Sequence, residues 1–265
     1  MSSFKKYIKV MQINFKNGVM YKLDYFSGII NILFVIVINI LVWKTLYESP
    51  GQGNSTQYKM MVTYIILSTI IQTTFIMDEF CIERTIKDGT IIHYLLKPMN
   101  FKAYLFSNAV GRLLFNLLML LVPAVICIKL FFDILMPYSP LYFAYFLITT
   151  VLGYIVLYTF NFIFWTFAFE SMTSWGLITL KNAFISVLSG ALIPLYLMPD
   201  SFVKVIENLP FQSIYYFPLA IYLGILPQAE IIKGIILQLV WIGVFLLIGE
   251  LLWRRVIKEI VVQGG

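Results

Sequence analysis

Residues 78–98 read DEFCIERTIKDGTIIHYLLKP, and they hold the densest mixture of opposite charges in the chain together with its only histidine. Long, mostly apolar stretches lie on both sides, at residues 60–77 before them and at about residues 104–131 after them. A membrane-spanning helix needs about 20 predominantly apolar residues. The pattern therefore predicts two spans joined by a charged segment, residues 78–98, at the membrane surface.

The first half of the charged segment predicts a short helix. Asp78 and Glu79 would lie at its start, where carboxylates interact favourably with the helix dipole. Asp88-Gly89 predicts a left-handed stop at its end. Two oppositely charged pairs have the spacing of four residues that shares a helix face: Glu83 with Lys87 and Arg84 with Asp88.

The second half predicts another short helix, which Pro98 would end. Four residues form its apolar face: Ile91, Ile92, Leu95 and Leu96. The alternative interpretation of the whole charged segment is a solvated loop whose charges only fix the topology, because charge runs are usually solvated faces.

The composition indicates an integral membrane protein. Of the 265 residues, 60% are hydrophobic and 12% are charged, whereas soluble domains have about 25% charged residues. The mean hydropathy is +0.88. The net charge of +6 is therefore no sign of nucleic-acid binding, and its basic residues are expected to set membrane topology.

The fold class expected is an all-α polytopic membrane protein, with six transmembrane helices in a single domain over residues 1–265. No internal repeat or Gly/Ser-rich linker divides the chain, and no cleavable signal peptide is expected, because the first apolar run follows a basic segment without a small-residue cleavage site. The expected spans are residues 25–43, 60–77, 104–131, 142–169, 175–197 and 232–253.

Residues 2–22 are too polar to span and predict an amphipathic helix in the inner membrane interface. Its apolar residues recur every three or four positions, while lysines occupy other faces. The alternative is a basic tail before the first span. The apolar positions are Phe4, Ile8, Met11 and Phe15.

Basic residues predict the orientation. Five lie in the N-terminal arm, four between Arg84 and Lys102, and three in the C-terminal tail, whereas the intervening loops hold almost none beyond Lys204 and Lys233. With six spans, all three groups fall on the cytoplasmic side, as the positive-inside rule requires. We therefore expect a multi-pass protein of the cell (plasma) membrane with both termini cytoplasmic.

Residues 208–229 are also uncharged, but three prolines interrupt them, and a broken backbone facing lipid is unfavourable. A seventh span would also place the basic C-terminal tail outside. We expect residues 199–230 to form an extracellular re-entrant segment, in which Asp200 is the N-cap of a short helix and Phe202, Ile206 and Leu209 share one face.

Two groups of residues carry a resemblance to a known family. The first lies between spans two and three: Glu83, Ile86, Asp88-Gly89-Thr90-Ile91 and Leu95-Leu96-Lys97-Pro98. The second follows span five: Gly190, Ile193-Pro194-Leu195, Met198-Pro199, Leu209-Pro210-Phe211, Tyr216, Pro218 and Gly224. With the six-span layout, these residues resemble the membrane (permease) subunit of a type-2 ABC exporter, whose ATP-binding subunits are separate chains.

The resemblance implies roles for particular residues. The charged segment would carry a coupling helix that contacts the ATPase: Glu79, Glu83, Arg84, Lys87, Asp88 and Gly89. The translocation pathway would run between two protomers and be lined by spans two and five: Gln72, Thr73, Ser186 and Ser189. An extracellular gate would cap it: Pro194, Pro199, Pro210 and Phe211. A homodimer and a related heterodimer both fit, and the cargo stays open among drug-like amphiphiles, peptides and lipid-linked glycans.

The chain itself is not expected to be an enzyme. It has no G-x-x-x-x-G-K-[ST] phosphate-binding loop, so ATP and magnesium are expected on the partner ATPase and no cofactor on this chain. Cys81, Cys127 and His93 are too few ligands for a metal site, and a disulfide is not expected between a cytoplasmic segment and a membrane helix.

Two other functions remain as alternatives. An ion-coupled transporter or channel would place ionisable residues deep in a span, but the nearest candidates, Arg112 and Lys181, lie close enough to inner ends to snorkel. A polytopic membrane enzyme would gather acids or histidines at one membrane depth, and this sequence does not. The neutral polar residues of the spans are expected to hydrogen-bond between helices: Asn31, Asn39, Gln72, Thr73, Asn116 and Asn161.

Overall fold

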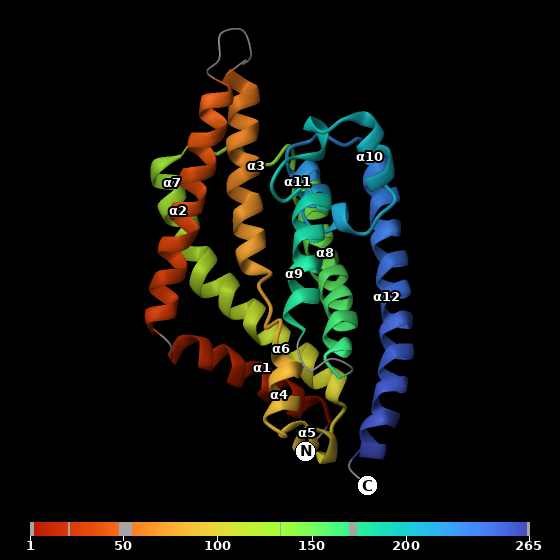
Figure 1. The fold of residues 1–265 in the computed structure, drawn as a ribbon. Helices are drawn as coiled ribbons and strands as arrows, with labels where there is room; N and C mark the ends of the chain where they lie inside the picture. The colour runs from red at the N-terminus through yellow and green to blue at the C-terminus, as the bar shows by residue number, and fades with distance from the viewer. Residues whose placement is uncertain (1–2, 21, 48–54, 133, 170–173, 264–265) are drawn as a thin grey trace. The chain divides into compact units, whose positions relative to one another are not determined.

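The computed structural model describes residues 3–20, 22–47, 55–132, 134–169 and 174–263. Within these ranges the chain forms helices and connecting turns without a strand, which confirms the all-α fold class (Figure 1). The expected loop at residues 48–57 and the expected turn at residues 170–174 lie largely outside the described residues.

The chain forms two compact units. The first contains Met1–Asp78 and Ile92–Met136, and the second contains Glu79–Ile91 and Pro137–Gly265. The charged segment is thus divided, since α4 belongs to the second unit and most of α5 belongs to the first. A single transmembrane domain over residues 1–265 stays a prediction.

In its described residues the first unit contains five complete α-helices (α1, α2, α3, α6 and α7) and a π-helical turn. It also contains all of α5 (Ile91–Leu96) except Ile91. α2 (Lys22–Tyr47), α3 (Ser55–Thr74) and α7 (Val122–Phe131) lie side by side (Figure 1). The π-helical turn Asn116–Leu121 joins α7 to α6 (Phe101–Phe115). Branched aliphatic side chains fill the core between α2, α3 and the α7 region: Ile32, Ile36, Ile40, Val62, Ile66, Ile70, Leu120, Ala124 and Ile128.

α1 (Ser3–Met20) packs lengthwise against α6. Close approach is possible because a Cβ on Gly111 would lie 2.6 Å from the backbone oxygen of Met11. The ring of Phe15 meets that of Phe115 edge-on at 6.1 Å. Part of the apolar stripe expected to face the membrane therefore contacts α6, while Lys5, Lys9 and Lys16 are exposed.

The second unit is built around α8 (Pro140–Phe167), with α12 (Gln228–Gln263) and α11 (Tyr216–Tyr222) packed against it. Gln238 of α12 is buried, and its Nε2 donates to the carbonyls of Thr149 (3.0 Å) and Ser213 (2.8 Å). One amide thus links α12 to α8 and to the 3₁₀ turn Phe211–Ser213. This unit also contains α4 (Cys81–Lys87), α9 (Trp175–Leu188) and α10 (Asp200–Ile206).

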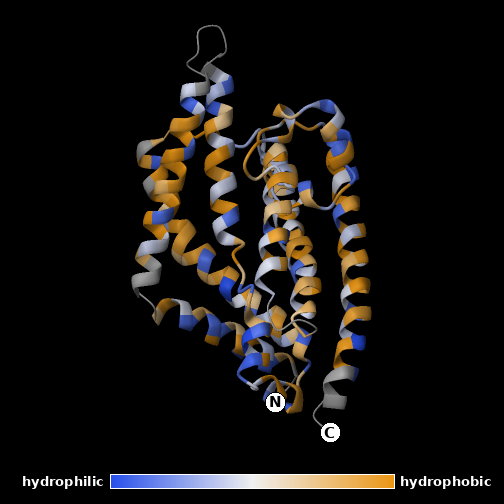
Figure 2. Cartoon of the chain, in the orientation of Figure 1, coloured by the Kyte–Doolittle hydropathy of each residue, from blue (hydrophilic) through white to orange (hydrophobic). Residues whose placement is uncertain are grey.

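Four stretches of the described residues are long and apolar enough to cross a membrane: Phe26–Thr45, Phe101–Leu130, Pro140–Phe167 and Gln228–Lys258. Figure 2 shows α2 and α12 as apolar over most of their length. The four stretches confirm a polytopic membrane protein and match four of the six expected spans. Crossing of the membrane by α3, which is rich in Ser, Thr and Gln, and by the 14-residue α9 stays a prediction.

The helices at the other two expected spans differ from the sequence prediction in their ends. α3 runs from Ser55 to Thr74 rather than over residues 60–77, and residues 75–80 are not helical. The fifth span was expected over residues 175–197, but α9 ends at Leu188. Gly190 then has a φ of 74°, and Pro194 has no N–H to continue a helix.

Residues 199–227 form only short helices, whereas residues 228–230 of the expected segment belong to the long helix α12. The expected N-cap at Asp200 is wrong, because Pro199 occupies that position and Asp200 is the first residue of α10, where its charge suits the dipole. α11 has 7 residues, about 10 Å at 1.5 Å per residue, and cannot cross a bilayer. Its re-entrant position in the outer leaflet stays a prediction.

Candidate functional site: the charged segment and its contacts with α9

The charged segment forms the two short helices that its sequence predicts, α4 and α5. α4 ends because Gly89 adopts a φ of 66°, a left-handed conformation that favours glycine. The Gly89 amide donates to the carbonyl of Ile86 at 3.0 Å. The segment is therefore helical rather than a loop, and the interpretation that its charges only fix the topology stays an alternative.

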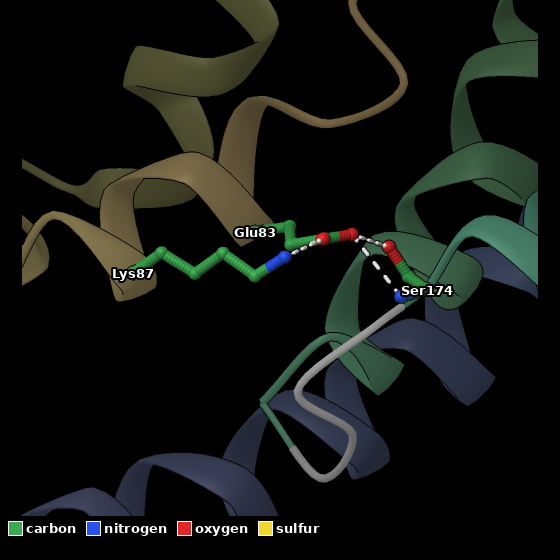
Figure 3. Close-up of polar contacts among 3 residues, drawn as sticks. All are labelled: Glu83, Lys87 and Ser174. Atoms are coloured by element: carbon green, nitrogen blue, oxygen red, sulfur yellow. Dashed lines mark hydrogen bonds and ion pairs between the residues drawn. The ribbon is translucent and has the colours of Figure 1, made fainter.

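Glu83 connects α4 to the start of α9 (Figure 3). Its Oε1 accepts a hydrogen bond from Lys87 Nζ at 2.5 Å, which confirms the expected pair. Its Oε2 accepts from the backbone N–H of Ser174 at 3.1 Å and also from the Ser174 hydroxyl. Since Ser174 is the N-cap of α9, the carboxylate lies at the positive end of the helix dipole.

These contacts stabilise the charged form of Glu83. The hydrogen bond from Lys87, and then that from Ser174, lower the pKa of the Glu83 carboxyl below its ordinary value of 4.5. The side chain is only 12% exposed. The Glu83 carboxylate is therefore already hydrogen-bonded to partners within the chain.

Glu79 makes the second connection to α9. Lys181 Nζ lies 2.5 Å from Glu79 Oε2 and 2.6 Å from Oδ1 of Asn161 on α8. The expectation that Lys181 snorkels to the interface is wrong, because its side chain has no exposed surface. Asn161 hydrogen-bonds between helices as expected, although to a charged partner.

Other residues of the charged segment face outward. Arg84, Lys87, Asp88 and Gly89 are exposed on and after α4. On α5, Ile91 is buried, whereas Ile92 and Leu96 are 55% and 77% exposed. His93 is exposed beside them. The expected apolar face of α5 is thus only partly covered.

The end of the charged segment is held within the first unit. Lys97 Nζ lies 4.7 Å from the centre of the Tyr94 ring, and the Tyr94 and Tyr104 rings are 4.9 Å apart. Lys6 of α1 donates to the carbonyl of Pro98 at 3.3 Å. α5 is therefore anchored at its C-terminal end.

The residues proposed to line a pathway bond mainly within their own helices. Gln72 Nε2 donates to Ser68 Oγ at 3.0 Å, and Thr73 Oγ1 donates to the carbonyl of Thr69 at 2.7 Å. Ser186 Oγ donates to the carbonyl of Ala183 at 2.9 Å. Ser189 is buried, and its carbonyl accepts from Tyr216 N–H at 3.0 Å, which joins the end of α9 to α11.

The proposed gate residues lie in different surroundings. Pro194 and Pro210 are buried, whereas Pro199 is exposed. Phe211 meets the ring of Phe160 on α8 at 5.3 Å. Three of the four positions thus contribute to the packing of the second unit.

Asn116 supplies the hydrogen bond between helices that its sequence position predicts. Its Nδ2 donates to the carbonyls of Thr73 (3.4 Å) and Thr74 (3.1 Å) at the end of α3. In contrast, Asn39 donates to the carbonyl of Val35 on its own helix at 2.9 Å.

The comparison with family models concerns almost the whole chain. The model of the ABC-2 family transporter protein matches residues 33–264, which include the charged segment and α9. The chain belongs to the ABC-2 transporter family. This ABC-2 protein is accordingly a membrane permease of an ABC transporter. A search among curated proteins gave no match.

Sequence reasoning missed the internal partners that Glu79 and Glu83 have in this permease. Lys181 offered a signal, since it is a lysine within an otherwise uncharged stretch and a buried cation requires a counter-charge. Ser174 offered none, because its contact with Glu83 joins residues 91 positions apart. In the described part of the chain Cys81 forms no disulfide, and no group of three or more His, Cys, Asp or Glu gathers at a metal-binding spacing.

Proposed function

We propose that this ABC-2 permease is the transport subunit of an ATP-driven exporter and is powered by a separate ABC ATPase that binds the charged segment. Two permease protomers form the pathway, as a homodimer or with a related chain. The family match supports the transport role. ATP and magnesium bind the partner, and this chain supplies the membrane path with both termini in the cytoplasm.

The observation that carries the proposal is the exposure of Leu96 on α5. This large apolar side chain is 77% exposed, and Ile92, one turn earlier, is 55% exposed. Exposed apolar groups bordered by polar residues mark surfaces that bind proteins or membranes. A short helix with such groups suits a groove on a soluble partner.

The proposed contact residues divide into two roles. Arg84, Lys87 and Asp88 are exposed, with Gly89 setting the turn after them, and they remain candidates for contacts with the ATPase. Glu79 and Glu83 bond within the chain, so their part in coupling is internal. Gln72, Thr73, Ser186 and Ser189 remain candidates for lining the pathway, as Pro194, Pro199, Pro210 and Phe211 do for its gate.

The test compares Leu96→Glu with Met136→Glu. Met136 is a matched control because its side chain is 79% exposed and the expected topology places it on the extracellular side. Each tagged permease is purified from its native cells in mild detergent, and the co-purifying ATP-binding chain and its vanadate-sensitive ATP hydrolysis are measured. We expect the wild type and Met136→Glu to retain both and Leu96→Glu to lose both.

Retention of the ATPase by Leu96→Glu at the wild-type ratio would refute the docking surface. A wild-type preparation without ATP hydrolysis would refute the ATP-driven function. Normal chromatographic behaviour of purified Leu96→Glu confirms that the substitution leaves the permease folded, as its exposure predicts.

A further inference from the structure

The glutamates of the charged segment contact α9 at two points on one helix face. Glu83 bonds to Ser174 at the start of α9, and Glu79 bonds to Lys181. Ser174 and Lys181 are seven residues apart, which is close to two helical turns. α4, through Glu83, and the residues just before it, through Glu79, are thus attached to a helix about 90 to 100 residues further along the chain.

The Glu79–Lys181 contact is more than a surface ion pair. Lys181 is fully buried, and its ammonium group has a second acceptor in Asn161. Replacing a buried ion pair by apolar residues is often neutral or stabilising, whereas removing one partner leaves an unfavourable buried charge. Stability alone therefore gives little reason for this pair, and a role in the function of the permease explains it better.

α4 is not a continuation of the preceding helix α3. Residues 75–80, which precede α4, are not helical. Packed elements that move as rigid bodies transmit displacement through their contacts. α4 packs against α8, and its segment is bonded to α9.

We propose that the Glu79–Lys181 ion pair transmits movement of the charged segment to α9, so that α9 follows α4 during the ATPase cycle. Glu79 and Lys181 are positioning residues in this role, and Asn161 orients the ammonium group. The inference rests on the proposed function, since it requires an ATPase that acts on the charged segment. It identifies α9 as a helix that responds to movement of the charged segment.

The main variant is Glu79→Gln with Lys181→Met, which removes both charges together. Lys181→Met alone leaves the Glu79 carboxylate without its cation and is expected to lower the melting temperature of the permease. The charge-reversed variant Glu79→Lys with Lys181→Glu keeps an ion pair, because the Asn161 amide can rotate to donate instead of accept. The control is Glu250→Gln with Arg254→Met, which removes an exposed ion pair of 2.7 Å on α12.

The readout is the reactivity of one cysteine on α9, introduced as Phe184→Cys in a background without Cys81 and Cys127. Phe184 is 53% exposed. The permease–ATPase complex is reconstituted in lipid, and maleimide labelling is measured without nucleotide and with ATP plus vanadate. In the Phe184→Cys background and in the control, we expect ATP plus vanadate to change the labelling rate severalfold. In Glu79→Gln/Lys181→Met this change should be lost while ATP hydrolysis continues. In the charge-reversed variant the change should return.

An undiminished labelling change in Glu79→Gln/Lys181→Met would overturn the ion-pair role and leave the proposed function intact. Failure of the charge-reversed variant to recover any labelling change, although it is folded and hydrolyses ATP, would also overturn it. Absence of ATP hydrolysis in the wild-type complex would instead overturn the proposed function, and the inference with it. The melting temperature of each purified permease separates misfolding from uncoupling.

Discussion

At the scale of single residues, Glu83 combines an acid's charge with a capping role. Its carboxylate accepts three hydrogen bonds, one from Lys87 and two from Ser174. All three require the ionised form to be fully effective. The contribution of Glu83 to folding should therefore depend on pH.

We predict that Glu83→Gln lowers the free energy of unfolding by about 1 kcal/mol at neutral pH, the usual net value of a hydrogen bond. Because the pKa of Glu83 is lowered in the folded state, its contribution is complete above the ordinary value of about 4.5 and is lost as the pH falls through the folded-state pKa. The difference in melting temperature between wild type and variant should thus be constant near neutrality and shrink below that pH.

The measurement is thermal unfolding of purified protein in detergent across this pH range. Glu250→Gln is the control, since Glu250 has a similar pairing with Arg254 four residues later but is 35% exposed, and exposed pairs contribute little. A pH-independent difference for Glu83→Gln would contradict the prediction.

At the scale of elements, Gly153 determines how closely α8 approaches the 3₁₀ turn Phe211–Ser213. A Cβ at this position would lie 3.0 Å from the carbonyl oxygens of Ser213 and Ile214. We predict that Gly153→Leu destabilises the protein by about 1–3 kcal/mol, the usual effect of overpacking. Gly243 on α12 is the contrasting case, because an added Cβ there would meet no atom of another part of the chain within 4 Å. Gly243→Ala should be neutral or stabilising by about 0.5–1 kcal/mol. Equal melting temperatures for both variants would exclude this role of Gly153.

Local patterns predicted the short elements better than the ends of the long ones. Spacing and turn residues indicated α4, α5 and the stop at Gly89, because those signals act within a few residues. The end of α9 at Leu188 was missed, since an apolar stretch continues beyond it and only Gly190 and Pro194 mark the break. A lysine in an otherwise uncharged stretch indicates that Lys181 needs a counter-charge, but Glu79 is 102 positions away, so the sequence does not identify the partner.

At the scale of the whole molecule, the number of spans decides which side of the membrane each loop occupies. Six spans place Lys87 inside and Met136 outside. If α3 and α9 do not cross, these two positions exchange sides. Glu207 is outside and Lys258 is inside in both arrangements, so they serve as fixed references.

We predict that single cysteines replacing Met136 and Glu207, in a background without Cys81 and Cys127, react with a membrane-impermeant maleimide on intact cells. Cysteines replacing Lys87 and Lys258 should react only after permeabilisation, as the positive-inside rule requires. All four side chains are exposed, so burial does not limit the reaction. External labelling at Lys87 with protection at Met136 would show four spans.

The last helix has a consequence for the lipid around the permease. Between Lys233 and Glu250, α12 has 16 uncharged residues, which is about 24 Å of helix. The hydrocarbon core of a typical bilayer is about 30 Å thick. A short hydrophobic stretch is accommodated by local thinning of the bilayer or by flanking side chains that reach the headgroups, and Lys233 is placed for the second. We therefore expect the permease to be more stable in bilayers of short acyl chains, and its stability in lipids of increasing chain length tests this.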